Sequence, residues 1–208
     1  MQTDLMASSG IRSVCVYCGS GLGANPSFTD TARTFGRLLA ESGLTLVYGG
    51  GSIGLMGTVA ESAIRHGGKV IGIIPEFLTW RENTLKDAHE VVVTRDMHER
   101  KRLMFERSDA FVALPGGIGT LEELVEQLTW AQLGRHAKPI LIANIDGFWN
   151  PLLALFNHMQ QMAFIRPGLD VSLLSADRVE DILPRLRDAA EATAAARKDL
   201  TPDVAGRL

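Results

Sequence analysis

The sequence contains little cysteine: only Cys15 and Cys18 occur among its 208 residues. Their C-x-x-C spacing is also found in redox and metal sites. Both lie in the apolar run 14–18, which is typical of a β-strand. Residues three apart on a strand point to opposite faces of the sheet. We therefore expect the two thiols to diverge and to pack as small buried side chains, without a redox or metal role.

Runs of positive charge and long apolar runs are also missing. The formal net charge is −3 and no stretch is rich in Lys and Arg, so no nucleic-acid partner is expected. No apolar stretch approaches the roughly 20 residues that span a bilayer, so no membrane partner is expected either. The first ten residues are polar and lack an apolar secretion core, which makes the cytoplasm the expected location. An anionic ligand would then need a local binding site.

Two common nucleotide-binding motifs are absent. No glycine turn is followed by Gly-Lys-Ser or Gly-Lys-Thr, the end of a P-loop. A dinucleotide site needs G-x-G-x-x-G after the first strand and an acidic residue at the end of the second. The glycines of Gly19–Gly23 have a different spacing, and the second strand ends Val47-Tyr48-Gly49 without a carboxylate. An ATP or NAD enzyme is therefore disfavoured.

Short apolar runs alternate with amphipathic stretches along the chain. This pattern predicts an α/β fold: a Rossmann-like, doubly wound parallel sheet with helices on both faces, in a single domain. The predicted strands are Val14–Tyr17, Leu44–Tyr48, Val70–Ile74, Glu90–Thr94, Ala110–Leu114, Pro139–Ala143 and Val171–Leu174. The predicted helices are Pro26–Ser42, Gly54–His66, Met97–Arg107, one ending near Leu133, and one opened by a cap at Asn150 with Pro151 in its first position.

The ends of the chain and one long connection fall outside this pattern. We expect the domain to span residues 12–190, preceded by a flexible tail, 1–11. Residues 191–208 are rich in alanine and charge, which fits either a surface helix or a disordered segment. Residues 75–88 show neither helical nor strand periodicity, and loops of that length in compact domains are often functional.

Glycine-rich turns follow three of the predicted strands, at Gly19–Gly23, Gly49–Gly57 and Gly116–Gly119. In open parallel sheets, ligands bind beyond the carboxyl ends of the strands. Glycine lets backbone N–H groups approach a ligand, and a helix that begins at the turn adds its positive end. One such turn would suggest only a tight bend. Three at one edge of a sheet indicate a phosphorylated ligand.

The predicted helix from Met97 carries a charge in an apolar position. Arg100 falls in line with Met97 and Met104, and Lys101 lies beside it. A charge in such a stripe needs either a partner or a cleft. Alternatively, the stem of Arg100 packs against the core while its guanidinium reaches water.

Thr120 and Glu123 share the first turn of the helix after the third glycine turn. Their spacing is also that of a capping box, in which Glu123 would cap Thr120. Glu122 and Glu123 would in addition favour the positive end of the helix. A cap does not require a proline and three glycines before it, so a functional role for Glu123 is the competing interpretation.

These residues carry a resemblance to a known family. Pro115–Glu123 resembles the P-G-G-x-G-T-x-x-E signature of the lonely guy phosphoribohydrolases, once labelled lysine decarboxylases, and Met97–Lys101 resembles their M-H-x-R-K element. The segments Gly49–Gly57 and Thr129–Gly134 are also similar. The resemblance extends over Val14–Leu186, nearly the whole predicted domain.

The resemblance implies an enzyme that hydrolyses the N-glycosidic bond of adenosine 5′-monophosphates, with or without an N6 substituent. The products would be the free base, a cytokinin or adenine, and ribose 5-phosphate. The resemblance also implies a homodimer without metal or organic cofactor. Its catalytic pair would be Arg100 and Glu123, and its substrate contacts Glu82, Arg100, Lys101, Gly117, Ile118, Gly119, Thr120, Leu121, Glu122, Glu123 and Thr129.

The chemistry of such a site is coherent, because a carboxylate can stabilise the oxocarbenium-like state at the ribose C1′. Glu123 could do this, activate water or hold the ribose hydroxyls, and Arg100 could stabilise the departing base or orient Glu123. The sequence does not decide between these roles, nor between adenine and an N6-substituted adenine.

Two other classes compete with a phosphoribohydrolase. A decarboxylase would need a lysine that forms a Schiff base with pyridoxal phosphate. The candidates are few, and the resemblance places Lys101 where the family binds substrate. A non-catalytic carrier of a nucleotide or cofactor, similar to the molybdenum-cofactor carriers, would need no Arg100–Glu123 pair.

For the homodimer, apolar surface is expected on the helices that carry Leu124, Leu128 and Trp130, and on Phe148–Phe164.

Overall fold

The computed structural model describes residues 10–79, 88–165 and 173–199. Seven parallel strands form one sheet in the order β4-β3-β2-β1-β5-β6-β7. The strand order reverses between β1 and β5, as in doubly wound folds. The strands are β1 (Ser13–Tyr17), β2 (Thr45–Tyr48), β3 (Val70–Pro75), β4 (Glu90–Thr94), β5 (Ala110–Ala113), β6 (Ile140–Ala143) and β7 (Leu173–Ala176). The predicted α/β fold is confirmed.

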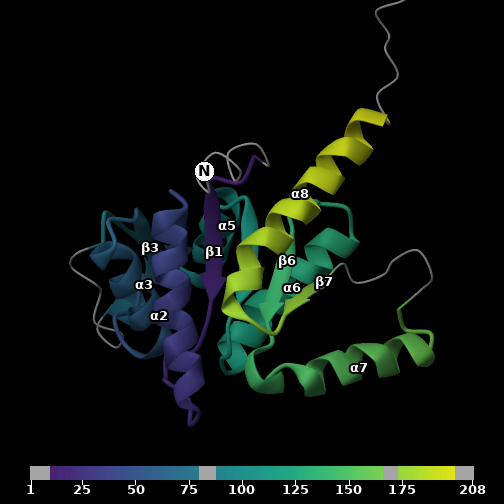
Figure 1. Cartoon of the computed structure of the whole chain (residues 1–208), viewed down its shortest axis with the longest axis horizontal. Helices are drawn as coiled ribbons and strands as arrows, with labels where there is room; N and C mark the ends of the chain where they lie inside the picture. Colours follow the sequence, from purple (N-terminus) through teal and green to yellow (C-terminus); the bar gives the residue numbers. More distant parts are fainter. Residues whose placement is uncertain (1–9, 80–87, 166–172, 200–208) are drawn as a thin grey trace, which may run out of the picture.

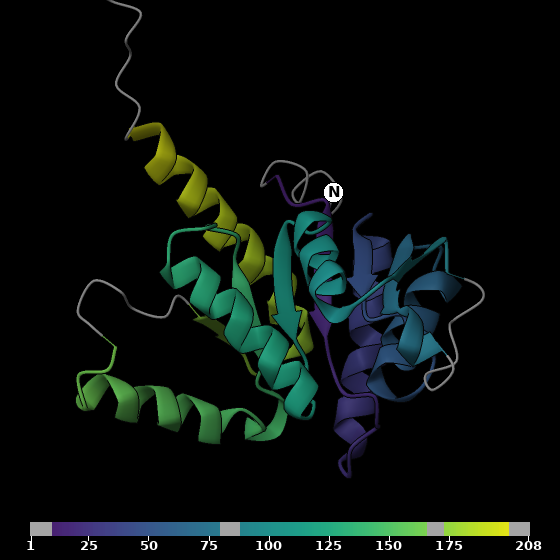
Figure 2. The ribbon, with the colours of Figure 1, turned by 180° about the vertical axis from the view of Figure 1, so that it is seen from behind.

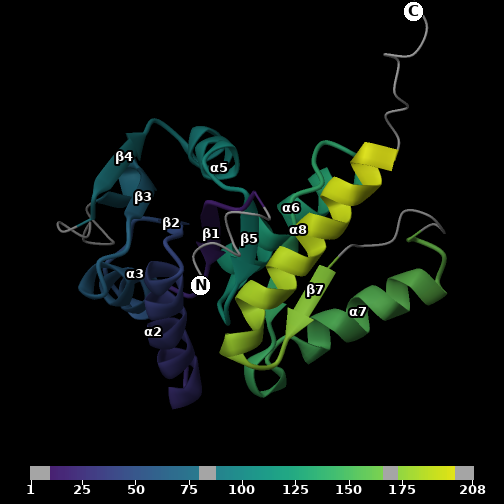
Figure 3. The same ribbon diagram turned by 45° about the horizontal axis from the view of Figure 1, so that its top comes forward.

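Helices cover both faces of the sheet (Figures 1 and 2). Helices α2, α3 and α8 pack on one face, and α5 and α6 on the other. Helix α7 extends away from the sheet, and none of its residues is buried (Figure 3). The helices are α2 (Pro26–Glu41), α3 (Gly54–Arg65), α5 (Met97–Glu106), α6 (Ile118–Gln132), α7 (Asn150–Gln161) and α8 (Ile182–Asp199), with short 3-10 segments at Glu76–Leu78, Ile145–Gly147 and Val179–Asp181.

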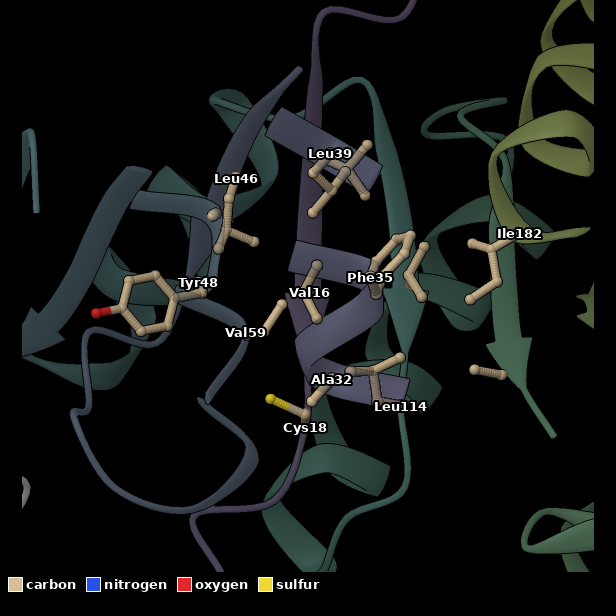
Figure 4. Packing of buried hydrophobic residues seen from close by; sticks show 14 of the residues in the cluster. Val16, Cys18, Ala32, Phe35, Leu39, Leu46, Tyr48, Val59, Leu114 and Ile182 are labelled. Atoms are coloured by element: carbon tan, nitrogen blue, oxygen red, sulfur yellow. The ribbon is translucent and has the colours of Figure 1, made fainter. Parts of the chain in front are cut away.

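The core consists of two apolar layers, one on each face of the sheet. Val14, Val16 and Cys18 pack with α2 and α3 in one layer, part of which Figure 4 shows. Cys15 and Tyr17 pack in the other layer with Leu124 of α6. Both thiols are free and buried. The predicted divergence of Cys15 and Cys18 is confirmed, and their burial raises the pKa of both thiols.

Helix α7 begins differently from the prediction. Asn150 is its first helical residue, whereas Trp149 occupies the cap position and makes no side-chain capping bond. The prediction of a cap at Asn150 was wrong because its Oδ1 accepts a hydrogen bond from Asn144 Nδ2 at 2.9 Å. The Asn150 side chain thus contacts the segment that precedes the helix instead of capping the helix.

Strand β7 ends two residues after the predicted strand, and residues 171–172 of that prediction lie outside the described residues. Ser175 and Ala176 belong to the strand because they pair with Ile142 and Ala143 of β6. Neither residue type favours strands strongly, so the composition of the sequence does not identify them as strand residues.

Residues 191–199 are helical, because helix α8 extends over them. The domain limits at residues 12 and 190 stay a prediction. Within the described part of the chain, no helix is long and apolar enough to cross a bilayer.

Candidate active site

The three glycine turns meet beyond the carboxyl ends of β1, β2 and β5. Gly19 N donates a hydrogen bond to Pro115 O at 3.1 Å, and Leu55 N donates one to Gly19 O at 3.0 Å. Gly54 has a φ of +64°, and a Cβ there would overlap the Ser20 carbonyl. The turns are therefore packed against one another, at the point where the strand order reverses.

Helix α6 starts at the third glycine turn, with Gly117 at the cap position and no side-chain capping bond. Thr120 is thus the third helical residue, and the capping-box interpretation of Thr120 and Glu123 is wrong. The Thr120 side chain lies against Gly116, where a Cβ would overlap its hydroxyl. Glycine at 116 lets the β5 turn and the first turn of α6 approach each other closely.

Arg100 and Glu123 form a buried ion pair between α5 and α6. Arg100 Nη1 lies 3.2 Å from Glu123 Oε1, and the two side chains are 9% and 10% exposed. Arg100 Nε also donates to Ile73 O at 3.1 Å, and Nη2 donates to Gly49 O at 3.4 Å. The alternative in which the guanidinium reaches water is therefore wrong, because the charge has a partner.

The contacts of Arg100 indicate how it acts on Glu123. Each of its three guanidinium nitrogens faces a protein oxygen. Two of these oxygens are backbone carbonyls, of Ile73 in β3 and of Gly49 directly after β2. Such a rigid, planar donor set fixes the direction of a carboxylate better than a flexible ammonium would. Because an adjacent cation also favours the ionised carboxylate, Arg100 both orients Glu123 and stabilises its charge.

Three titratable side chains on β1 and just after it, Cys15, Tyr17 and Cys18, interact with Glu123 and are uncharged. Burial raises the pKa of Cys15, Cys18 and Tyr17, and the Glu123 carboxylate raises it further in each case. These groups stay neutral at physiological pH. Arg100 and the positive start of α6 therefore place positive charge beside Glu123.

A polar pocket of about 220 Å³ opens over this pair. An apolar pocket of about 270 Å³ adjoins it, with Phe28, Leu55 and Phe148 in its walls. Both pockets share Gly19, Ser20 and Gly117. The lining of the polar pocket is Cys18, Gly19, Ser20, Met56, Arg100, Gly117, Ile118, Gly119, Thr120 and Glu123.

Of the residues expected in the site, the structure thus brings together Arg100, Glu123 and the segment Gly117–Thr120. The predicted site residues omitted Cys18, Gly19, Ser20 and Met56 of this lining. The first three directly follow β1, and Met56 lies in the first turn of α3, so the glycine-rich segments at Gly19–Gly23 and Gly49–Gly57 were the available signal.

The other expected residues lie apart from the pocket or outside the description. The side chain of Leu121 packs against the core, and its N–H donates to Gly117 O at 3.0 Å. The Thr129 hydroxyl is exposed and donates to Val125 O at 2.8 Å. Glu82 lies outside the described residues.

Lys101 and Glu122 pair with each other beside the pocket. Lys101 Nζ lies 2.7 Å from Glu122 Oε1 and 2.9 Å from Glu126 Oε1. Burial lowers the pKa of Lys101, but its hydrogen bonds to the two carboxylates outweigh that effect and the net shift is upward. Lys101 is therefore a charged ammonium.

Comparison with known structures supports the fold. The structure is similar to a molybdenum cofactor binding protein from Rippkaea orientalis, with a TM-score of 0.66 and 24% identity over 86% of this chain and 96% of the other. The molybdenum cofactor carrier protein of Chlamydomonas reinhardtii gives a TM-score of 0.63 with 18% identity, over 87% and 99% of the two chains. At such identities the likeness concerns the fold alone.

Comparison with known sequences is closer. Residues 56–186 match the family model described as "Possible lysine decarboxylase". Cytokinin riboside 5′-monophosphate phosphoribohydrolase LOG3 of Arabidopsis thaliana is 45% identical over 89% of this chain and 86% of its own length. Cytokinin riboside 5′-monophosphate phosphoribohydrolase LOG of Oryza sativa subsp. japonica is 46% identical over 86% and 74%. With its signature residues gathered around one pocket, the chain belongs to the lonely guy (LOG) family of phosphoribohydrolases.

Proposed function

We propose that this protein hydrolyses the N-glycosidic bond of adenosine 5′-monophosphates, including those with an N6 substituent, and releases the free base and ribose 5-phosphate. The observation that carries the proposal is the buried Arg100–Glu123 pair, which shares a pocket with the start of α6. The names of the LOG relatives describe the same reaction class.

The start of α6 suits the 5′-phosphate. The first N–H groups of a helix have no acceptor within it, and the helix dipole adds positive charge there. In α6 these groups belong to Ile118, Gly119 and Thr120, which line the pocket. Gly117 has no protein atom near the position of a Cβ, so its backbone is open to a ligand. A phosphate at this end would fix the sugar relative to Glu123.

Glu123 lies one turn further along α6, where the sugar would be. As the bond between C1′ and the base nitrogen breaks, positive charge develops on the ribose ring and the Glu123 carboxylate stabilises it. Water adds its oxygen to C1′, and its protons end on the new hydroxyl and on the departing base. Arg100 acts on this step by holding Glu123 ionised and in position.

The name of the family model raises the decarboxylase alternative. A Schiff-base lysine needs a neutral amine, usually desolvated or beside another cation. Lys101 instead contacts two carboxylates. Lys138 has a pKa lowered by burial, but it precedes β6 and therefore lies at the amino edge of the sheet, away from the pocket. Neither lysine favours a pyridoxal phosphate site, and an absorbance scan of the purified protein should show no aldimine band.

The carrier alternative is weakened by the same ion pair. Burying two charges costs free energy. A protein that only binds a ligand does not need such an ion pair beside it. Arg100 and Glu123 are both buried, and both line the pocket. Catalysis gives a reason for their presence there.

The test of the proposal is base release from matched substrates. We expect release from AMP or isopentenyladenosine monophosphate, and kcat/KM at least about 100-fold lower on the matching nucleoside. Two hydrogen bonds to a charged group are lost without the phosphate, at about 1.5–3 kcal/mol each. Comparable efficiency on nucleotide and nucleoside would remove the phosphate site, and the two nucleotides together would show which base is preferred.

We also propose that the active form is a homodimer. Helix α7 has no buried residue and exposes Leu155 and Met159, followed by Met162 and Phe164. Contiguous apolar surface of this kind marks association sites. On α6, Leu124 and Leu128 are buried in the core of their own chain, while Val125 of the same helix is 39% exposed.

A further inference from the structure

Ser20 occupies a distinct position in the polar pocket. It is exposed, and it follows β1 in the turn that links this strand to α2. Among the residues that the structure describes, its hydroxyl has no hydrogen-bond partner. Arg100 and Glu123 are already bonded to each other. Thr120, the other hydroxyl in the lining, is only 4% exposed and lies against Gly116. Ser20 therefore offers the accessible hydroxyl of this pocket.

The backbone around Ser20 is held firmly on both sides. Gly19 N bonds Pro115 O at 3.1 Å, which ties the turn to the segment that leads into α6. Leu55 N contacts both Gly19 O, at 3.0 Å, and Gly21 O, at 3.3 Å. Gly54 lies so close to the Ser20 carbonyl that only glycine fits there. A hydroxyl presented by such a fixed turn is pre-organised for a ligand.

The position of Ser20 also indicates which part of a ligand it would meet. Ser20 and Gly117 line both the polar and the apolar pocket, whereas Arg100 and Glu123 line only the polar one. Ser20 thus lies at the border of the two pockets together with Gly117, the cap residue of α6. The start of α6 is where the backbone N–H groups favour an anion.

We propose that the Ser20 hydroxyl donates a hydrogen bond to the phosphate of the substrate and completes a cradle whose other side is the start of α6. This inference rests on the proposed function. It adds a side-chain donor from a different strand of the sheet to the backbone donors of α6. Ser20 is then a substrate-binding residue that acts on the phosphate, without contact to the reacting C1′.

The test compares Ser20→Ala with Ser20→Thr, which keeps the hydroxyl, and with Ser27→Ala as a matched control. The Ser27 hydroxyl is bonded to Asp146 at 2.6 Å and lines neither pocket. We expect Ser20→Ala to lower kcat/KM on the nucleotide about tenfold or more, mainly through KM. Ser20→Thr should recover most of that loss, and Ser27→Ala should stay within about twofold of the unsubstituted protein.

A second arm isolates the phosphate and does not require turnover. Calorimetric binding of ribose 5-phosphate should weaken about tenfold in Ser20→Ala, while weak binding of adenosine should not change. Equal losses for nucleotide and nucleoside, or unchanged ribose 5-phosphate binding, would overturn the assignment. If the unsubstituted protein released no base, the proposed function would fail, yet weaker ribose 5-phosphate binding in Ser20→Ala would still support the phosphate contact.

Discussion

At the scale of single residues, the site depends on the direction in which one carboxylate is held. Glu123 is 8% exposed and would be costly to bury alone. Arg100 offsets that cost, and the backbone oxygens of Gly49 and Ile73 hold the guanidinium in turn. A change to any member of this chain of contacts should alter catalysis even where the substrate does not touch it.

Glu123→Gln should lose nearly all turnover while still binding AMP. The substitution keeps the volume and removes the charge, so it affects the transition state more than the ground state. We expect kcat to fall about 100-fold or more, measured as base release at saturating nucleotide. Glu106→Gln removes an exposed carboxylate of α5 that pairs with Arg102, and it should keep full activity. Near-normal turnover of Glu123→Gln would contradict the catalytic assignment.

At the scale of elements, the first turn of α6 can form the site only because the β5 turn approaches it closely. The side chain of Thr120 occupies the space that a side chain at Gly116 would need. The β5 turn and the first turn of α6 are therefore packed against each other. This close packing depends on Gly116, which has no side chain to contribute to the site.

Gly116→Ala should consequently destabilise the protein by about 1–3 kcal/mol, the usual cost of overpacking a tight contact. It should also lower activity by displacing Thr120. Gly21→Ala is the matched control, because a Cβ at Gly21 meets no atom within 4 Å. Urea unfolding of both variants measures the difference. Equal stability of the two would show that the β5 turn can relax.

The elements themselves were largely predictable from the sequence. Strand β4 has the predicted bounds, and most helices differ from the prediction by one residue at an end. Strands buried on both faces leave apolar runs that are easy to identify. The cap of α7 was predicted wrongly because Asn150 accepts its hydrogen bond from Asn144, six residues earlier, instead of capping the helix.

The candidate site was predictable in part. The signature motifs indicated Arg100 and Glu123, but no local pattern shows that Arg100 reaches Gly49, 51 residues away along the chain. Ser20 was missed for a related reason. A single serine in a glycine turn has no periodicity, and its meaning comes from the turns that close around it.

At the scale of the whole molecule, α7 packs Leu152, Leu153 and Phe156 against the core but leaves Leu155 and Met159 exposed. We expect the protein to be a dimer by light scattering at micromolar concentration. The double substitution Leu155→Glu and Met159→Glu should shift it to a monomer, because it places charges in the apolar surface. Val93→Glu is the control: Val93 is 56% exposed on β4, at the opposite edge of the sheet from β7. A monomeric mass for the unsubstituted protein would contradict the proposal.

The reaction of Cys15 and Cys18 with a thiol reagent would report on two different parts of the structure. Cys15 belongs to the layer of α5 and α6, and Cys18 to the layer of α2 and α3. Cys15 is fully buried, so a thiol reagent reaches its sulfur only when the layer of α5 and α6 opens, whereas Cys18 is 6% exposed and lines the polar pocket. A chain that retains only Cys15 would therefore time the opening of that layer, and a chain that retains only Cys18 would report access to the pocket. Ligand bound over Glu123 should block the labelling of Cys18 directly, and should slow that of Cys15 only as far as it stabilises the closed layer.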